Sequence, residues 1–574
     1  MQRPAIADNK PIALLLTALP MTIDLSRTTP RLPRINGWTV TVWLIALLVA
    51  SPILVVLGSV LSPSYGVFSH LASSVLSHYI THSLLLLVGV GVGVLVIGIG
   101  TAWLVTMCRF PGSRLFEWAL LLPLAAPAYL LAYTYTDWLD YYGPVQFWLR
   151  SQFGWQSVSD YWFPDVRSVG GAIAMFSLTL YPYVYMLARV AFLEQSVCTL
   201  EASRSLGCGP WRSFFRVALP LARPAIIAGL SLALMETLSD FGTVDYFGVS
   251  TFTTGIYRTW FGMGARVAAA QLSAMLMVFI LILIVLERWS RRQAKYYQAK
   301  NSVQRPQAYE LQGLRAWGAI ATCGLPITLG LLLPGGLLAH MTLTHLEETL
   351  DNRFLELAQH SLILAGLTAG IGVVVALVLG YGERLSKQRA VSLGVRLASM
   401  GYAVPGAVIA VGILIPVVRF DQGLSAWIEA ATGNNIGLIL SGTITALIFA
   451  YLVRFLAVAL GTVESGLGKI RPTIDDAARS LGCSPTKTLV KIHTPLMASS
   501  LLTAVMLVFV DVMKELPATL VMRPFNFDTL AVRVYQYASD ERLVEASAPA
   551  LMILLVGLLP VILLSWRITR ERNA

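Results

Sequence analysis

The sequence predicts an all-α polytopic membrane protein that consists of two tandem domains of about six transmembrane helices each. Hydrophobic residues make up 56% of the 574 residues, charged residues make up 13%, and the mean hydropathy is +0.68. A chain this apolar cannot cover a globular surface with polar groups, which favours the bilayer as its main solvent. Apolar segments of about 20 residues, the length that crosses a hydrocarbon core, recur along it. Two polar loops between these segments carry matching sequences, which indicates an internal duplication.

The charge balance and the cysteines argue against several other classes of protein. Lys and Arg number 42 against 31 for Asp and Glu, a net charge of +11. In a membrane protein, basic loops on the cytoplasmic side account for such an excess, so no nucleic-acid partner is predicted. The five cysteines are scattered and include no Cys-x-x-Cys pair. Neither a disulfide framework nor a zinc site is indicated.

Two motifs that could suggest catalysis or metal binding do not meet the requirements. Gly468-Lys469 resembles the end of a phosphate-binding loop, but Val463 stands at the earlier glycine position and Ile470 replaces the required Ser or Thr. The chain is therefore predicted to be no enzyme and to have no ATPase of its own. His340 and His345 are five residues apart and have no further ligand nearby in sequence. No metal site is assigned.

The elements are predicted in order along the chain. Residues 1–36 form a cytoplasmic tail whose one apolar run, 12–19, is too short for a span, and no small-residue cleavage site of a signal peptide clearly follows it. The first domain, residues 37–290, has predicted spans at 38–61, 80–106, 116–137, 169–193, 223–247 and 268–287. A basic linker, 291–314, is predicted to be cytoplasmic. The second domain, 315–574, has predicted spans at 316–339, 357–382, 394–418, 436–463, 498–522 and 546–567.

The duplication is supported by landmarks that return at a nearly constant shift in residue number. The string RSLGC at 204–208 recurs at 479–483, and Pro220 recurs as Pro495 with the same shift. The string HSL at 82–84 recurs at 360–362, with a slightly larger shift. Small insertions or deletions explain the drift. The two halves of one chain are therefore predicted to be homologous.

The repeated loops, 201–220 and 476–495, are polar and basic between apolar spans. Each reads as a short helix, a glycine stop and a proline restart. At these residues the sequence resembles the permease subunits of ABC importers, whose signature is Glu-Ala-Ala, a Gly four residues on, and an apolar-x-Leu-Pro ending. The first copy departs at Ser203 and Val217, and the second at Asp476 and Thr494.

The resemblance implies that each loop forms a coupling helix that docks in a groove of a cytoplasmic ATPase, within a type I importer permease fold. The residues that inherit this role are Glu201, Ala202, Gly207 and Pro220 in the first loop and Asp476, Ala477, Gly482 and Pro495 in the second. An ordinary basic loop that only orients the protein is the alternative. Two copies in register favour the coupling role.

Four carboxylates are predicted within membrane spans. Glu236 and Asp240 are four residues apart and share one helix face, and Asp511 and Glu515 repeat the pair with the same shift as the loops. A carboxylate at this depth costs about 2.5–3.5 kcal/mol on an insertion scale, so it usually faces a cavity or a partner. The four are candidates for a cation path between the halves. Structural ion pairs, such as Asp511 with Lys514, are the alternative.

Arginine and lysine positions predict the orientation. The amino tail, both repeated loops, the linker and the carboxyl end carry the basic residues and fall on one side, which is predicted to be the cytoplasm. Both termini are therefore expected there. The stretch 137–167, with aspartates among tryptophans and tyrosines, falls on the opposite side. It is a candidate docking face for a binding protein, with an interfacial aromatic belt as the alternative.

Shorter strings narrow the resemblance to the fused permeases of ferric iron importers. They lie at 181–183, 236–242, 253–260, 516–519 and 523–529, and the likeness covers most of the chain. It implies a multi-pass protein of the bacterial inner membrane that receives iron(III) from a periplasmic iron-binding protein. It also implies two copies of an ATPase subunit that hold ATP and Mg, with no cofactor bound by this chain. Permeases for thiamine, polyamine or phosphonate share the loops and stay open as alternatives, as does a secondary transporter driven by an ion gradient.

Overall fold

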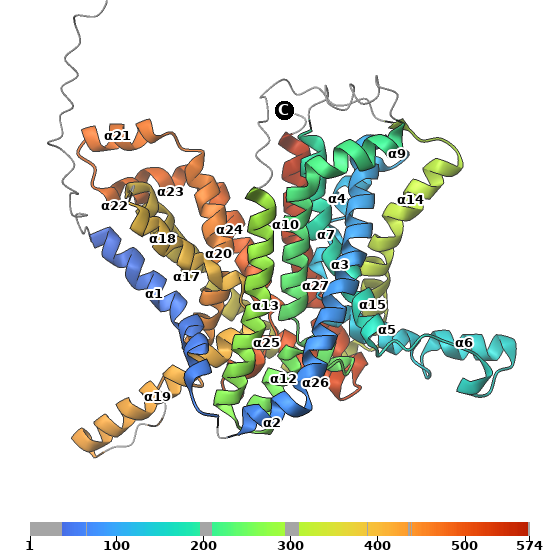
Figure 1. Cartoon of the computed structure of the whole chain (residues 1–574), viewed down its shortest axis with the longest axis horizontal. Helices are drawn as coiled ribbons and strands as arrows, with labels where there is room; N and C mark the ends of the chain where they lie inside the picture. The colour runs from blue at the N-terminus through green and yellow to red at the C-terminus, as the bar shows by residue number, and fades with distance from the viewer. Residues whose placement is uncertain are drawn as a thin grey trace, which may run out of the picture.

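The structure, a computed structural model, describes residues 37–571 except positions 65, 387 and 438 and the segments 196–208, 293–308 and 434–436. In this part of the chain the only sheet is a parallel pair of two-residue strands, β1 (Cys108–Arg109) and β2 (Tyr309–Glu310). Ten helices are long and apolar enough to cross a membrane, and two bent helix pairs raise the number to twelve if each counts as one span. The predicted all-α polytopic fold is confirmed (Figure 1).

The first half has six spans by this count. Its helices are α1 (Gly37–Gly58), η1 (Ser59–Leu61), α2 (Val67–Ser74), α3 (Leu76–Met107), α4 (Ser113–Ala119), η2 (Leu122–Ala125), α5 (Ala128–Leu139), α6 (Pro144–Phe153), η3 (Val158–Asp160), α7 (Val169–Leu193), α9 (Pro210–Ser213), η4 (Phe214–Ala218), α10 (Leu219–Ser239), α11 (Gly242–Tyr246), α12 (Phe252–Tyr257), η5 (Arg258–Gly262) and α13 (Arg266–Arg292). The predicted tail 1–36 and most of the predicted linker lie outside the described residues.

The second half repeats the same order of spans. Its helices are α14 (Leu314–Ile327), η6 (Thr328–Leu332), α15 (Leu333–Thr344), α16 (Leu346–Thr349), α17 (Asn352–Leu385), α18 (Arg389–Ala398), η7 (Ser399–Ala403), α19 (Gly406–Thr432), α20 (Ile444–Gly468), α21 (Pro472–Ser480), α22 (Pro485–Thr488), η8 (Leu489–His493), α23 (Thr494–Leu496), α24 (Ala498–Met513), α25 (Pro517–Met522), α26 (Leu530–Ser539) and α27 (Leu543–Glu571).

A partly buried histidine contact at equivalent places supports the duplication in three dimensions. The Nδ1 atom of His82 lies 3.1 Å from the carbonyl oxygen of Ser250, and the Nδ1 atom of His360 lies 3.2 Å from that of Asp528. His82 lies near the start of α3 and His360 near the start of α17, which are the second spans of their halves. The two carbonyl groups precede the short helices α12 and α26. The repeated HSL string therefore marks a contact that both halves keep.

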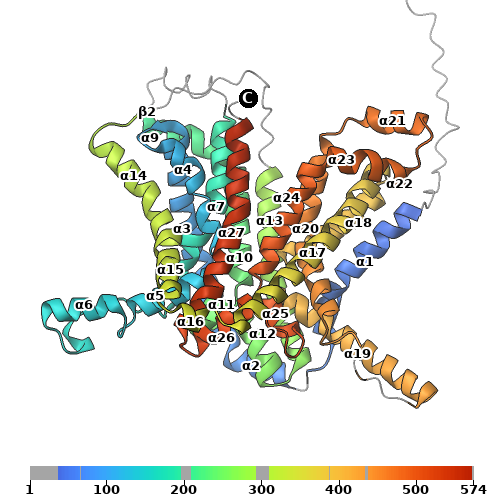
Figure 2. The same ribbon diagram turned by 180° about the vertical axis from the view of Figure 1, so that it is seen from behind.

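The first helix of each half packs on the other half. Helix α1 contacts α17, α18 and α19, and it approaches α19 so closely that a Cβ atom on Gly412 would lie 2.4 Å from the carbonyl oxygen of Pro52. In return, the α14–η6–α15 span packs against α3, α4 and α5, where the Tyr135 hydroxyl donates to the carbonyl of Leu329 at 2.7 Å. This exchange joins the two halves into one helical body (Figures 1 and 2).

Two predicted spans, 223–247 and 498–522, were wrong at their carboxyl ends. Helix α10 ends at Ser239 and α24 at Met513, and a short helix, α11 or α25, begins shortly after each of these ends. The apolar run continues past the break, so hydropathy alone does not reveal it. In both halves a carboxylate caps the short helix, as described below, and in the second half Pro517 also cannot continue α24.

Three other spans have different limits from those predicted. The span predicted at 116–137 is a bent pair, with an 87° bend before α5, where Pro127 cannot continue the helix. The span predicted at 394–418 breaks before Gly406, since Pro405 precedes it, and α19 then runs on to Thr432. The span predicted at 436–463 begins only at Ile444. Figures 1 and 2 show α6 and the far end of α19 projecting to opposite sides, toward the end that carries α2, α12 and α26.

Candidate translocation site and coupling surface

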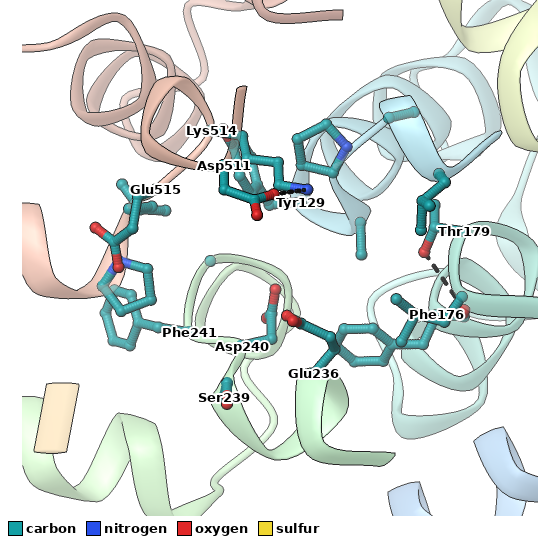
Figure 3. Close-up of a pocket in the computed structure, with 18 of the residues that line it drawn as sticks. Tyr129, Phe176, Thr179, Glu236, Ser239, Asp240, Phe241, Asp511, Lys514 and Glu515 are labelled. Carbon is teal, nitrogen blue, oxygen red and sulfur yellow. Dashed lines mark hydrogen bonds and ion pairs between the residues drawn. The ribbon is translucent and has the colours of Figure 1, made fainter. Parts of the chain in front are cut away.

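A cavity of about 120 Å³ lies between the two halves. Its lining comes from α5, α7, α10 and α11 of the first half and from η7, α20, α24 and α25 of the second. All four predicted carboxylates line it: Glu236, Asp240, Asp511 and Glu515 (Figure 3). The structure therefore brings together both repeated pairs. Their role in a translocation path stays a prediction.

Within each pair, the second carboxylate caps a short helix. The Asp240 carboxylate accepts the backbone N–H groups of Thr243 at 2.9 Å and Val244 at 3.3 Å. The Glu515 carboxylate accepts those of Ala518 at 3.0 Å and Thr519 at 3.1 Å. These amides begin α11 and α25 and have no partner inside their own helix. The caps explain why the chain can break at this depth.

The first carboxylate of each pair caps no helix. Glu236 accepts a hydrogen bond at 3.2 Å from the hydroxyl of Tyr402, which belongs to the other half. Asp511 forms an ion pair with Lys514 at 2.9 Å, so the structural pair weighed from the sequence is present. In Figure 3 the carboxylates of Glu236 and Asp511 face the cavity from opposite halves. These two acids are therefore freer to interact with a passing ion than Asp240 and Glu515 are.

The cationic side chains that line the cavity both come from the second half. Arg454 donates to Glu515 at 2.9 Å, with 11% and 1% of the two side chains exposed, and Lys514 pairs with Asp511. The repeat places Ser239 opposite Lys514 in the first half, and Ser239 also lines the cavity. The lining has four acids and two bases, so it is net acidic, with the surplus on the first-half side.

Sequence reasoning missed Arg454 and three tyrosines of the cavity, Tyr129, Tyr183 and Tyr402. The tyrosines each had a signal. Tyr129 and Tyr402 lie close to Pro127 and Pro405, which recur with the same shift as the HSL string, and Tyr183 belongs to the string at 181–183. The sequence alone showed no interaction partner for these tyrosines, because their neighbours in the fold are far away in sequence. Among the described residues, no group of three or more His, Cys, Asp and Glu side chains could hold a metal ion.

The second repeated loop has the predicted short helix and glycine stop. Helix α21 ends in a Schellman motif: Gly482 has a φ of 72°, the N–H of Cys483 donates to the carbonyl of Ala478, and that of Gly482 donates to the carbonyl of Arg479. The helix restarts at Pro485, the first residue of α22, and continues to Leu496, where an 82° bend separates it from α24. Pro495 lies in α23 at the end of this helix, so the predicted restart at Pro495 was wrong. A glycine stop between two helices is therefore confirmed in this loop.

The outer face of this loop is exposed. Asp476 and Ala477 are both exposed, and the Asp476 carboxylate forms an exposed ion pair with Arg479 at 3.7 Å. Leu481 has 83% of its surface exposed. Of the first loop, Glu201, Ala202 and Gly207 lie outside the described residues, while Pro220 stands in the first turn of α10. The coupling roles stay predictions for both loops.

The neighbour of Asp476 anchors the loop and was not singled out from the sequence. The Asp475 carboxylate accepts from Nε of Arg384 at 2.8 Å and lies 2.6 Å from Nε2 of His493. Arg384 also donates to the carbonyl groups of Leu467 and Ile470, at the end of α20. Asp475 thus ties α21 to α17, α20 and η8. The repeat places Leu200 and Ala218 opposite Asp475 and His493, so the first half cannot form this network.

The stretch 137–167 forms an arm around α6. Tyr142 and Trp162 have 91% and 86% of their surface exposed. The Asp160 carboxylate folds back on the chain and accepts the N–H groups of Ser157 and Gln156, and these bonds hold its pKa below the ordinary value. The arm has exposed aromatic and acidic groups, and its use as a docking face stays a prediction.

Comparison with known proteins extends these observations. The family described as binding-protein-dependent transport system inner membrane component matches residues 34–296 and again 371–570. The Fe(3+)-transport system permease protein FbpB 2 of Haemophilus influenzae is 27% identical over 495 residues, which cover 85% of this chain and 90% of that protein.

Two further relatives differ in how much of the chain they match. The ferric transport system permease protein FbpB of Actinobacillus pleuropneumoniae is 22% identical over 464 residues, 78% of this chain and 64% of that protein. The molybdenum transport system permease protein ModB of Escherichia coli is 29% identical over 201 residues, which are 34% of this chain but 84% of that protein. A relative that matches one third of the chain with nearly its whole length corresponds to one of the two repeats. The chain belongs to the family of binding-protein-dependent transport system inner membrane components, and it carries that family's domain twice.

Proposed function

We propose that this chain is the membrane-spanning permease of an ATP-driven importer and that it carries iron(III) across the bacterial inner membrane. The similarity to a Fe(3+)-transport permease over 85% of the chain carries the proposal. The coupling loops are its cytoplasmic contacts. Their local segments, α9 and α21, lie at the same end of the molecule (Figure 1), which supports one ATPase subunit on each, with ATP and Mg held there. A periplasmic iron-binding protein delivers the ion at the opposite end, and both termini are cytoplasmic.

The charge of the central cavity supports a cation over an oxyanion. Relatives that are about half as long as this chain are named as permeases for molybdenum or sulfate transport. In this chain four carboxylates and two cationic groups line the cavity, which repels an anion. Carboxylate and phenol oxygens are ligands that a hard trivalent ion prefers. A cavity of about 120 Å³ also suits an ion with a few water molecules better than an extended polyamine.

The substrate can be tested by deleting the gene and comparing iron uptake with the uptake of other substrates. Deletion of the gene should lower radioactive iron uptake under iron limitation and leave the uptake of thiamine, spermidine, molybdate and sulfate unchanged. Loss of one of the other substrates with normal iron uptake would overturn the iron assignment and keep the importer.

The energy source needs its own measurement. In vesicles that contain the chain, the ATPase and the binding protein, uptake should stop with an ATPase variant that cannot hydrolyse ATP and should continue after the proton gradient is collapsed. The reverse result would favour a secondary transporter.

A further inference from the structure

The two carboxylates that do not cap helices lie at equivalent positions and face the same cavity, one from each half. Glu236 in α10 and Asp511 in α24 are related by the same shift in residue number as the repeated loops. Each has a direct side-chain partner at the cavity, the Tyr402 hydroxyl for Glu236 and the Lys514 ammonium for Asp511. Asp240 and Glu515 are held in place because each caps a helix. Glu236 and Asp511 can change partners without disrupting a helix end.

One lysine, Lys514, interacts with both Asp511 and Glu236. The Lys514 Nζ atom lies 2.9 Å from Asp511, and Lys514 also interacts electrostatically with Glu236 and Tyr183. Both members of the Asp511–Lys514 pair are partly buried, with 20% and 30% of the side chains exposed. The first half has Ser239 where the second has Lys514, so the repeat supplies no second ammonium. Lys514 is therefore the lining cation next to these two carboxylates, since Arg454 pairs with Glu515.

A buried hydroxyl without a partner points into the same region. Tyr129 is 4% exposed and lines the cavity, and its hydroxyl makes no hydrogen bond within the described part of the chain. A buried polar group normally has a partner, because losing its bond to water costs about 1–3 kcal/mol. Tyr183 and Tyr402 add two further phenol oxygens to the lining. Oxygen donors of this kind, neutral or anionic, suit a hard cation.

We propose that Glu236 and Asp511, with the phenol oxygens of Tyr129 and Tyr402, form a transit site for a hard trivalent cation, and that Lys514 is its internal counter-cation. In this conformation the ammonium occupies the position that the ion takes during transport. The inference rests on the proposed cation import and adds the site and its competitor. A lysine that competes with the ion keeps binding weak, which conduction requires, since an ion held tightly does not leave. Positive charge beside the site also repels the ion directly.

The test measures binding apart from transport. The complex of permease and ATPase is placed in lipid nanodiscs without nucleotide, and Tb³⁺ is titrated while its luminescence is excited through nearby tyrosines. Lys514→Ser gives the second half the residue of the first. It should bind Tb³⁺ at least tenfold more tightly than the unchanged protein and should take up iron more slowly, because release is delayed. Lys514→Met, which keeps most of the side-chain volume, should behave in the same way and serves if the serine variant does not assemble.

The controls define the site. Lys469→Ser removes an exposed lysine at the end of α20, outside the repeated loop, and should leave Tb³⁺ affinity unchanged. Glu236→Gln added to Lys514→Ser should abolish the tighter binding. Folded Lys514 variants with unchanged affinity, or tighter binding that survives Glu236→Gln, would overturn the inference. Either result is compatible with normal iron uptake by the unchanged protein, so failure of the site and failure of iron import are distinguishable.

Discussion

Replacing Asp475 by asparagine should release α21, the helix of the second repeated loop, from the helical body. The carboxylate pairs with Arg384 and His493, whose side chains are 18% and 0% exposed, and is itself 14% exposed. Breaking a buried pair by removing one charge costs about 3–5 kcal/mol, and the lower value applies because Arg384 keeps its bonds to the carbonyls of Leu467 and Ile470. A local loss of about 3 kcal/mol corresponds to roughly 100-fold faster hydrogen exchange of the α21 amides.

The same variant should uncouple the ATPase from transport. ATP hydrolysis should continue while the amount of substrate moved per ATP falls, because movement of α21 no longer reaches α17 and η8. Asp476→Asn is the matched control: this exposed neighbour pairs with Arg479 of its own helix, so its α21 amides should exchange as in the unchanged protein. Unchanged exchange in Asp475→Asn, or an equal effect of both variants, would refute the anchoring role.

Three further predictions concern the second repeated loop and the cavity. Gly482→Val places a branched residue at a φ of 72°, which costs about 1–2 kcal/mol, so uptake should fall while the protein still inserts; wild-type uptake by the double variant with Gly207→Val would remove the coupling role. Glu515→Gln should lower the thermal unfolding temperature first, since it leaves Arg454 buried without its charge partner. Glu236→Gln should stay folded and slow iron uptake; stable, fully active variants at both positions would contradict the assignment of a cap and a path residue.

The architecture was predictable because a bilayer constrains sequence strongly. Apolar length, basic loops and a nearly constant repeat shift led to two domains of about six spans, and the structure agrees. The breaks after Ser239 and Met513 were not predictable from hydropathy, because the apolar run continues past them. A carboxylate directly before a short helix is the signal in both halves. It is readable only when the acid is considered as a helix cap as well as a charge in the membrane.

The site was predictable only in part. The repeat identified the four carboxylates, because a pair that recurs with a fixed shift is visible in one sequence. Their partners were not visible: Tyr402 meets Glu236 across 166 residues, and Arg384 meets Asp475 across 91 residues. Resemblance to a known signature also drew attention to Asp476, although its neighbour makes the buried contacts. The contacts in the fold thus distinguish acids that the sequence alone does not. Asp240 and Glu515 cap helices, Glu236 is a candidate for the translocation path, and Asp475 anchors α21.

The differences between the halves have a common direction. The second half supplies both cations of the cavity and the charged anchor of its repeated loop, whereas the first half has Ser239 opposite Lys514 and Leu200 opposite Asp475. Two identical subunits could not differ in this way, because every substitution would appear twice around the symmetry axis. Two lysines facing each other would repel, and a doubled counter-charge would cancel the acidity that attracts a cation. Joining the halves in one chain allows a single lysine to lie off the axis, so that one counter-charge can serve a site formed by both halves.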